Sequence, residues 1–254
     1  MKDKKVIWIT GASTGIGKAT ALKFASKGWS VAASARRDNL LNEMSQIHSN
    51  IYSFPLDVTN EDDCKKTSEK IIEKFGNIDL CIFSTGIHDP DSEKEFNSKT
   101  IRKIMEVNFF GTMNGINSIY NFFKNQKKGH ICIVSSVAGY RGLPAAGAYC
   151  SSKAALTSFS ESLYFDLYRH NVKVSLVSPG FIKTPMTDKN SFYMPMLKSA
   201  DYAAEKIYNG LVNKNSFEIH FPKSFTYLMK LIQFLPSSLY FGVQKFANKL
   251  IIKR

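Results

Sequence analysis

The stretch Thr10-Gly11-Ala12-Ser13-Thr14-Gly15-Ile16-Gly17 follows a short apolar run, Val6–Thr10, and leads into a helical pattern over Ile16–Lys27. Glycines at such a junction let backbone N–H groups approach a pyrophosphate, and the helix N-terminus adds partial positive charge. A plain turn could carry the same glycines, but the strand–turn–helix context favours a dinucleotide site. We therefore expect Gly11, Ser13, Thr14, Gly15, Ile16 and Gly17 to contact a bound dinucleotide.

Strand-like and helix-like segments alternate along the rest of the chain. Short apolar runs lie at Val6–Thr10, Ser30–Ala35, Ile51–Leu56, Ile78–Phe83, His130–Ser135, Val172–Val177 and Phe217–Phe221. They lack strict polar alternation, which is typical of strands covered on both faces. Helical patterns lie at Ile16–Lys27, Asn60–Phe75, Ser98–Lys124, Tyr149–His170 and Asp201–Asn213. This order predicts an α/β fold, a doubly wound Rossmann-type parallel sheet of about seven strands with helices on both faces.

Length and composition fit one domain. The chain has 254 residues, of which 44% are hydrophobic and 22% charged, and this excludes disordered and fibrous proteins. We expect residues 1–222 to form the nucleotide-binding catalytic domain and residues 223–254 to add a helical appendage to it. No apolar run is long enough for a signal peptide or a membrane span, so we expect a cytoplasmic protein. The four cysteines show no metal-binding spacing, so we expect buried, reduced thiols and no metal.

The chain is strongly basic, with 34 Lys and Arg against 21 Asp and Glu and a net charge of +13. A nucleic acid, an anionic membrane surface, or an anionic cofactor or substrate would each suit this charge. The basic residues are spread along the chain and not clustered in short runs, which argues against nucleic-acid binding. We expect no nucleic-acid partner.

The spacing Tyr149-x-x-x-Lys153 occurs at the start of a helical pattern. Residues i and i+4 share one helix face, so the phenol and the ammonium can address the same site. A nearby ammonium lowers the pKa of a phenol, which makes tyrosine usable as a general acid or base. The spacing alone would often be a solvated helix face, so its companions decide the interpretation.

The pattern G-x-x-x-G-x-G at Gly11–Gly17, together with Tyr149-x-x-x-Lys153, resembles the short-chain dehydrogenase/reductase family, and the resemblance covers Lys5 to about Phe221. It implies that Tyr149 and Lys153 are catalytic and also bind the cofactor. It further implies that Ser136 donates a hydrogen bond to a substrate carbonyl, and that Asn108 holds a water in a proton relay to the lysine. The cofactor contacts it implies are Asp57 and Val58 at the adenine, Gly86 after the fourth strand, and Pro179, Gly180, Ile182 and Thr184 near the nicotinamide. Plain capping by Asp57 and a plain turn at Pro179-Gly180 remain the alternatives.

The end of the second strand bears on the choice between NADP and NAD. NAD sites usually place an acidic residue about 20 positions after the glycines, whereas NADP sites place an arginine there. This chain has Ala35 followed by Arg36 and Arg37, which suits a 2′-phosphate. Asp38 could serve as the ribose acid, but its sequence context favours the N-cap of the next helix. Thr14 stands where many NADP-dependent members of the family have a basic residue. We expect NADP in preference to NAD.

One motif departs from the family pattern. The family usually has Asn-Asn-Ala-Gly after the fourth strand, and this chain has Phe83-Ser84-Thr85-Gly86. Only the glycine remains, which puts local stability and cofactor affinity in doubt.

The segment Phe181–Leu197 lies where the family places its substrate lid, and it contains Met186, Phe192, Tyr193, Met194, Met196 and Leu197. Such side chains form an adaptable apolar surface and indicate a lipophilic substrate, although they could equally pack the lid onto the core.

The C-terminal segment is apolar and basic. One helical face carries Leu239, Tyr240, Val243, Phe246, Ala247, Leu250 and Ile251, and the other carries Gln244, Lys245, Asn248 and Lys249. This amphipathic helix could pack on the domain, pair with another subunit or lie on an anionic membrane. We expect peripheral membrane contact in addition to a homodimeric or homotetrameric core.

The resemblance as a whole implies an NADP(H)-dependent oxidoreductase that transfers a hydride between the nicotinamide and a carbonyl or secondary alcohol. The alternative is an NADP-binding regulatory or sensor protein without turnover. The small-molecule substrate and the preferred direction of reaction do not follow from the sequence.

Overall fold

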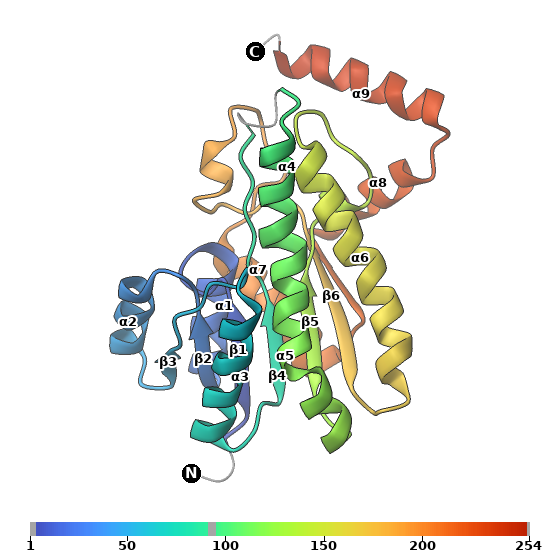
Figure 1. Cartoon of the computed structure of the whole chain (residues 1–254). Helices are drawn as coiled ribbons and strands as arrows, with labels where there is room; N and C mark the ends of the chain where they lie inside the picture. The colour runs from blue at the N-terminus through green and yellow to red at the C-terminus, as the bar shows by residue number, and fades with distance from the viewer. Residues whose placement is uncertain (1–3, 91–94, 253–254) are drawn as a thin grey trace.

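The seven strands of the computed structural model form one sheet, in which every neighbouring pair is parallel, in the order β3-β2-β1-β4-β5-β6-β7 (Figure 1). The structure describes residues 4–90 and 95–252, with side chains up to Phe246. The strands are β1 (Val6–Thr10), β2 (Ser30–Ser34), β3 (Ile51–Ser53), β4 (Leu80–Phe83), β5 (His130–Val134), β6 (Lys173–Pro179) and β7 (Glu218–Phe221). All seven predicted strands are therefore confirmed, although β3 ends before Leu56.

Helices cover both faces of the sheet, as the apolar strands require. One face packs α1 (Gly15–Ser26), α2 (Asp38–Ile47) and α7 (Ala200–Tyr208), with Phe24, Met44 and Ile207 buried. The other face packs α3 (Glu61–Phe75), α5 (Gly111–Gln126) and α6 (Gly147–Tyr168). Its helices are those drawn in front of the sheet in Figure 1. The predicted doubly wound fold is thus confirmed.

The predicted single helix Ser98–Lys124 is divided into three segments. The helix α4 (Ser98–Met105) leads into a five-residue π-helical turn, Glu106–Phe110, and then into α5. Single π-helical turns inside α-helices are rare and often occur at functional sites. This one contains Asn108, so the polar residue that is out of place in a helix interior coincides with the irregular turn.

The Phe83 side chain, at the end of β4, packs between the sheet and α5. Its ring is buried and packs edge-on against Trp8, with ring centroids 5.8 Å apart. A Cβ atom at Gly115 would lie 2.4 Å from the Phe83 ring. Because glycine leaves this space open, an aromatic ring is accommodated where the family has asparagine.

After β7 the chain forms α8 (Lys223–Gln233) and α9 (Ser237–Ile252), which extends beyond the rest of the molecule in Figure 1. The predicted stripe is divided, because Tyr240 is buried while Leu239, Val243 and Phe246 are exposed. Ala247, Leu250 and Ile251 lie outside the described side chains. Across residues 4–90 and 95–252, every helix is too short or too polar to span a bilayer. Cys64, Cys81, Cys132 and Cys150 are all buried and free of disulfides, as expected.

Candidate active site

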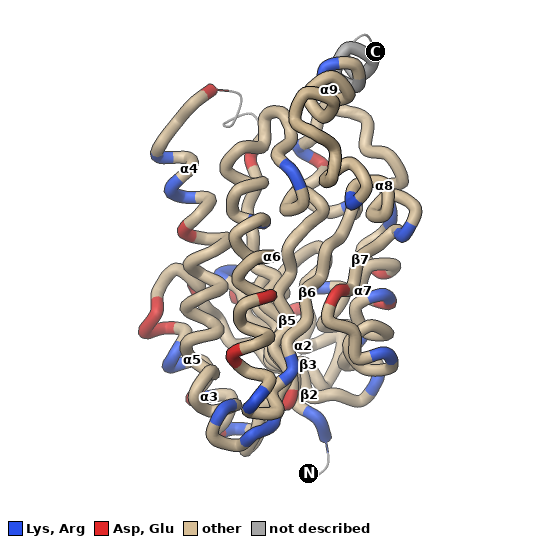
Figure 2. The backbone as a smooth tube through the Cα atoms, turned by 90° about the vertical axis from the view of Figure 1, so that its right-hand side faces the viewer, with Lys and Arg blue, Asp and Glu red and all other residues tan. Residues whose placement is uncertain are grey.

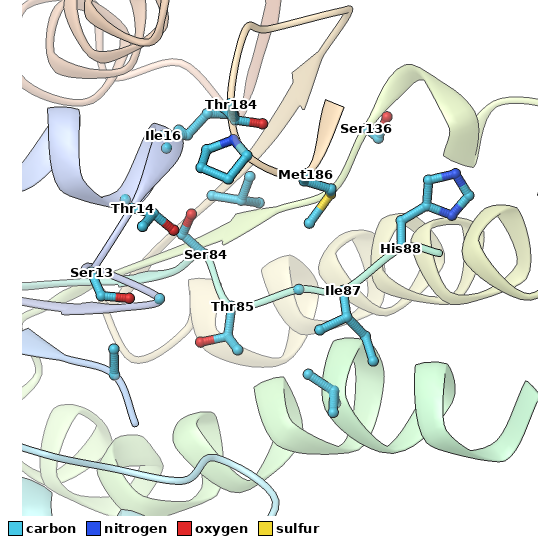
Figure 3. Close-up of a pocket in the computed structure, with 18 of the residues that line it drawn as sticks. Ser13, Thr14, Ile16, Ser84, Thr85, Ile87, His88, Ser136, Thr184 and Met186 are labelled. Atoms are coloured by element: carbon cyan, nitrogen blue, oxygen red, sulfur yellow. The ribbon is translucent and has the colours of Figure 1, made fainter. Parts of the chain in front are cut away.

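A pocket of about 470 Å³ lies at the carboxyl ends of β1, β4, β5 and β6 (Figure 3). This edge is where open α/β sheets bind ligands. All predicted site residues line it except Asn108: Gly11, Ser13, Thr14, Gly15, Ile16, Gly17, Arg36, Arg37, Asp57, Val58, Gly86, Ser136, Tyr149, Lys153, Pro179, Gly180, Ile182 and Thr184. The structure therefore brings together residues that are up to 173 positions apart, from Gly11 to Thr184.

The glycine loop is shaped by close backbone contacts. Gly11 has a φ of +68°, and a Cβ atom there would lie 2.8 Å from the carbonyl oxygen of Ser84. At Gly17 a Cβ atom would lie 2.3 Å from the carbonyl oxygen of Gly11. Only glycine fits these positions, so the loop folds tightly over the start of α1, where free backbone N–H groups attract phosphate.

Arg37 crosses the glycine loop. Its Nη2 donates to Oγ of Ser13 at 2.8 Å and to Oγ1 of Thr14 at 3.0 Å. The side chain of Arg36 is exposed, with Nη1 4.0 Å from Oδ2 of Asp57. Two guanidinium groups therefore lie at the end of β2 where the ribose of a dinucleotide is expected.

Asp38 does not cap α2. It is the first residue of α2 and not its N-cap, which is Arg37, and no side-chain hydrogen bond caps this helix. The Asp38 carboxylate instead accepts a hydrogen bond from Oγ of Ser53 at 2.9 Å. This cross-link to β3 explains why the N-cap prediction was wrong. Asp38 is also not among the described residues that line the pocket.

Asp57 does not cap α3. Its Oδ1 accepts hydrogen bonds from the backbone N–H of Thr59 at 3.0 Å and from the Thr59 hydroxyl at 2.8 Å. The N-cap of α3 is Asn60, whose side chain accepts from the backbone of Asp63. Asp57 and Val58 therefore line the pocket for a reason other than helix capping.

Tyr149 and Lys153 lie one turn apart at the start of α6, as their spacing predicts. Lys153 is buried, its Nζ donates to the carbonyl oxygen of Val134 at 2.9 Å, and it lies 5.7 Å from the centre of the Tyr149 ring. Burial lowers the pKa of Lys153 from 10.5 to about 8. The pKa of the Lys153 ammonium thus lies close to neutral pH, and the ammonium lies beside the Tyr149 phenol. General acid–base chemistry uses such an arrangement.

Ser136 follows β5 directly and faces the pocket, where Figure 3 labels it. Its Oγ accepts from the backbone N–H of Ala138 at 3.1 Å, at the start of a short 3₁₀ turn, Val137–Gly139. The neighbouring Ser135 instead donates to the carbonyl oxygen of Lys153 at 2.8 Å, which ties β5 to α6. Of the two serines, Ser136 is therefore the one placed to meet a substrate.

Asn108 supports the pocket from behind. It is fully buried, and its Oδ1 accepts from the backbone N–H of Ile87 at 2.7 Å. Its Nδ2 donates to the carbonyl oxygen of Ile87 at 3.0 Å and to Oγ of Ser152 at 3.0 Å. Both Asn108 Oδ1 and Lys153 Nζ would lie 3.6 Å from a Cβ at Gly86. Its side chain therefore fixes the turn after Gly86 and lies close to the lysine.

Thr85 places a buried polar atom in the pocket without a protein partner. Its Oγ1 has no hydrogen bond among the described residues, and Figure 3 shows Thr85 in the pocket lining. Such groups are rare in folded proteins, and a bound polar ligand would satisfy the hydroxyl. The family's alanine at this position offers no such hydroxyl, so this chain gains a hydrogen-bonding group there. Together with the glycine loop and the arginines, it fits a bound dinucleotide.

His88 is the main pocket residue that the sequence analysis missed. Its ring centroid lies 4.6 Å from that of Tyr149, and the two planes are tilted by 37°. Met186 and Lys189 of the expected lid also line the pocket, while Tyr193 and Met196 are exposed. A single histidine outside any motif carries no signal in one sequence, so only the folded chain reveals its place.

Comparison with known proteins agrees with this geometry. The family model described as short chain dehydrogenase matches residues 5–192. The chain belongs to the short-chain dehydrogenase family. An uncharacterised oxidoreductase of Myxococcus xanthus is 32% identical over 236 residues, which cover 91% of this chain and 93% of the relative. This short-chain dehydrogenase is accordingly an oxidoreductase with a nucleotide-binding Rossmann fold.

Two further similar proteins are informative. The 3-oxoacyl-(acyl-carrier-protein) reductase FabG of Thermotoga maritima is 34% identical over 191 residues, or 74% of this chain and 78% of the relative. The solved structure of ElxO with NADP bound is 27% identical and superposes with a TM-score of 0.77, covering 86% of this chain and 98% of that chain. The similarity thus extends over most of both relatives.

Proposed function

We propose that the protein is an NADP(H)-dependent oxidoreductase that interconverts a lipophilic carbonyl compound and its secondary alcohol. The observation that carries this proposal is the meeting of Tyr149, the buried Lys153 and Ser136 in the pocket that also holds Arg37. A purely regulatory nucleotide-binding protein would need the glycine loop and the arginines, but not this triad.

The cofactor would be held from both ends of the pocket. The glycine loop would bind the pyrophosphate, Arg36 and Arg37 the 2′-phosphate, and Asp57 and Val58 the adenine. Pro179, Gly180, Ile182 and Thr184, at and after the end of β6, would flank the nicotinamide. The bound ElxO cofactor named above is NADP, which supports this choice. When bound, the cofactor supplies the hydride.

The protein's own residues would handle the proton. The hydroxyl of Ser136 would donate a hydrogen bond to the substrate carbonyl oxygen and fix its orientation. The Tyr149 hydroxyl would give a proton to that oxygen in reduction and take it back in oxidation. The ammonium of Lys153 stabilises the phenolate that remains on Tyr149. Asn108 would keep the segment after Gly86 in place beside Lys153, because its side chain bonds the backbone of Ile87.

The lid supports an apolar substrate. Phe181 packs against Phe192, with ring centroids 5.9 Å apart, while Met186 reaches the pocket. The relative FabG is named for a reductase of 3-oxoacyl groups, which are ketones on fatty chains. A long-chain ketone would suit this apolar lining better than a small polar carbonyl compound.

A panel of carbonyl compounds tests the proposal through the loss of NADPH absorbance. We expect turnover with aliphatic and polycyclic ketones, and slower turnover with small polar ketones of similar reactivity. Binding of NADPH without turnover of any compound, in either direction, would contradict the proposal and favour a regulatory role.

A further inference from the structure

The helix α8 is apolar on two opposite faces. Phe225 and Met229 are buried against the domain, where Phe225 packs on Phe181 with ring centroids 5.6 Å apart. The outward face carries Tyr227, Leu228, Leu231 and Phe234, all exposed, and Phe234 is 82% exposed. Residues four and seven positions apart share a helix face, so Tyr227, Leu231 and Phe234 form one continuous apolar stripe. Packing within the domain accounts for the inner face only.

The helix α9 presents a second exposed stripe. Leu239, Val243 and Phe246 follow the same helical spacing and are all exposed. The Tyr240 hydroxyl, in the first turn of α9, donates to the carbonyl oxygen of Gly142 and so attaches this turn to the domain. Beyond this turn α9 projects from the molecule in both Figure 1 and Figure 2.

The position of α9 is set by Arg141. Its Nη1 donates at 2.8 Å to the carbonyl oxygens of both Gln233 and Leu235, which lie at the turn between α8 and α9. Its guanidinium also stacks over the Tyr240 ring at 4.3 Å. The two apolar stripes are therefore presented by an anchored element and not by a loose tail.

The charge of this segment is of one sign. Residues 219–254 contain six basic residues and no aspartate or glutamate. Lys230 is paired with Glu218, just before this range, and the other five are Lys223, Lys245, Lys249, Lys253 and Arg254. Exposed apolar side chains interspersed with cations, without carboxylates, are typical of helices that lie in the interface of an anionic membrane. Each cation near such a surface strengthens binding.

The lid continues this surface. Oγ of Ser224 on α8 contacts Sδ of Met196 at 3.3 Å, so the two segments touch. Met196 and its neighbour Tyr193 are exposed, while Met186 and Lys189 of the same segment line the pocket. The apolar surface thus extends from α9 across α8 to the edge of the pocket.

We propose that α8, α9 and the exposed part of the lid form a docking surface for an anionic lipid bilayer. A second copy of the chain fits less well, because a two-fold interface would place two acid-free, basic segments against each other. On a bilayer the stripes of both helices insert to interfacial depth, and the cations lie at the anionic headgroups. The pocket edge then opens at the membrane surface.

Cosedimentation with vesicles tests the docking surface without any substrate or turnover. We expect the full-length protein to bind vesicles of phosphatidylglycerol and phosphatidylcholine more strongly than vesicles of phosphatidylcholine alone, and to be released by salt. Leu231→Ser should lower the partition coefficient at least about threefold, because a large apolar side chain is lost from the interface. Lys245→Glu should lower it at least about tenfold on the anionic vesicles.

Matched control variants separate this surface from general effects. Ile47→Ser removes an apolar side chain of nearly equal exposure, 69% against 67% for Leu231, from the distant helix α2. Lys66→Glu makes the same charge change on α3. Equal losses in test and control variants would overturn the proposal, as would absence of the wild type from the vesicle pellet at low salt. The proposal would also be overturned if the wild type does not bind vesicles and light scattering shows that Leu231→Ser converts a dimer into a monomer. The stripe would then be an interface between two copies of the chain.

Discussion

The hydroxyl of Tyr140 donates a 2.6 Å hydrogen bond to Oε1 of Glu218, and this bond joins the loop after Ser136 to the last strand of the sheet. Glu218 is also paired with Lys230 of α8. Burial opposes ionisation of Glu218, but the hydrogen bonds from Lys230 and Tyr140 prevail and lower its pKa. The carboxylate therefore holds the loop after Ser136 and helix α8 to one point.

Tyr140→Phe should loosen this loop while leaving the aromatic ring in place. A hydrogen bond to a charged group contributes about 1.5–3 kcal/mol, so we expect a loss of about 1.5 kcal/mol in the free energy of unfolding. Because Ser136 lies four residues earlier, kcat should fall about tenfold while the Kd for NADPH stays unchanged. In a Ser136→Ala background the same substitution should have little further effect on kcat. Additive losses in the double variant would show that Tyr140 does not act through Ser136.

Tyr149→Phe should remove the proton donor and leave the fold intact. We expect turnover to fall at least about 10²-fold, as for the loss of a general acid. The Kd for NADPH, measured by fluorescence titration, should change little, because phenylalanine keeps the aromatic ring in place. Full activity of this variant would refute the assigned mechanism.

The double substitution Arg36→Ala with Arg37→Ala should act on NADPH selectively. Charge-assisted hydrogen bonds to the 2′-phosphate contribute about 1.5–3 kcal/mol each, so the affinity for NADPH should fall tenfold or more, roughly, while that for NADH changes little. Arg169→Ala, at the end of α6, controls for the loss of positive charge. Equal weakening of both cofactors would mean that the arginines do not recognise the phosphate.

Lys153 should leave a signature in the pH dependence of stability. Its pKa is about 8 in the folded protein and 10.5 as the ordinary value, so between these values the unfolded state binds more protons. The free energy of unfolding therefore rises with pH through this window, by about 3 kcal/mol from this group. Below about pH 8 the penalty for burying the charge is fully present.

Lys153→Met provides the comparison for this effect, because it keeps a long side chain without the charge. The difference in unfolding free energy between wild type and Lys153→Met, from urea titrations, should shift in favour of the wild type from pH 8 to pH 10.5. Titrating groups far from Lys153 cancel in this difference. A difference that stays constant over this range would contradict the lowered pKa of the buried lysine.

Gly115→Ala should destabilise the fold through Phe83. The added methyl group would lie 2.4 Å from the ring, and overpacking of this kind costs about 1–3 kcal/mol. Phe83→Leu combined with Gly115→Ala should recover part of this loss, because a smaller side chain frees the space. Thermal unfolding of the single and double variants measures the coupling; simple additivity would contradict a direct contact.

The strands and the glycine loop could be predicted from the sequence because their signals are local. Apolar runs such as His130–Ser135 need cover on both faces, and the glycines of the loop have a backbone reason to be there. The π-helical turn at Asn108 was missed because a helical pattern does not show one extra residue in a turn. The N-cap prediction for Asp38 was wrong because Ser53, on a distant strand, binds its carboxylate.

The pocket was predictable only where a motif pointed to it. Tyr149 and Lys153 have a recognisable spacing, whereas His88 and Thr85 reach the pocket through the path of the chain after β4. The tail shows the same limit. Its helical pattern was evident, but the burial of Tyr240 depends on Arg141, which precedes it by 99 residues and has no visible link to it in the sequence.

The strand order has a consequence for how the protein acquires activity. In a fully parallel sheet no strand can pair with its chain neighbour through a short hairpin, and β1 must wait for β4, whose Leu80 pairs with Ile7. Non-local pairing of this kind is slow to form. Because the pocket uses the ends of β1, β4, β5 and β6, a chain emerging from the ribosome gains no working site until most of its length is synthesised. Recovery of activity after dilution from denaturant would thus report the assembly of β1, β4, β5 and β6 together and not of any one of them.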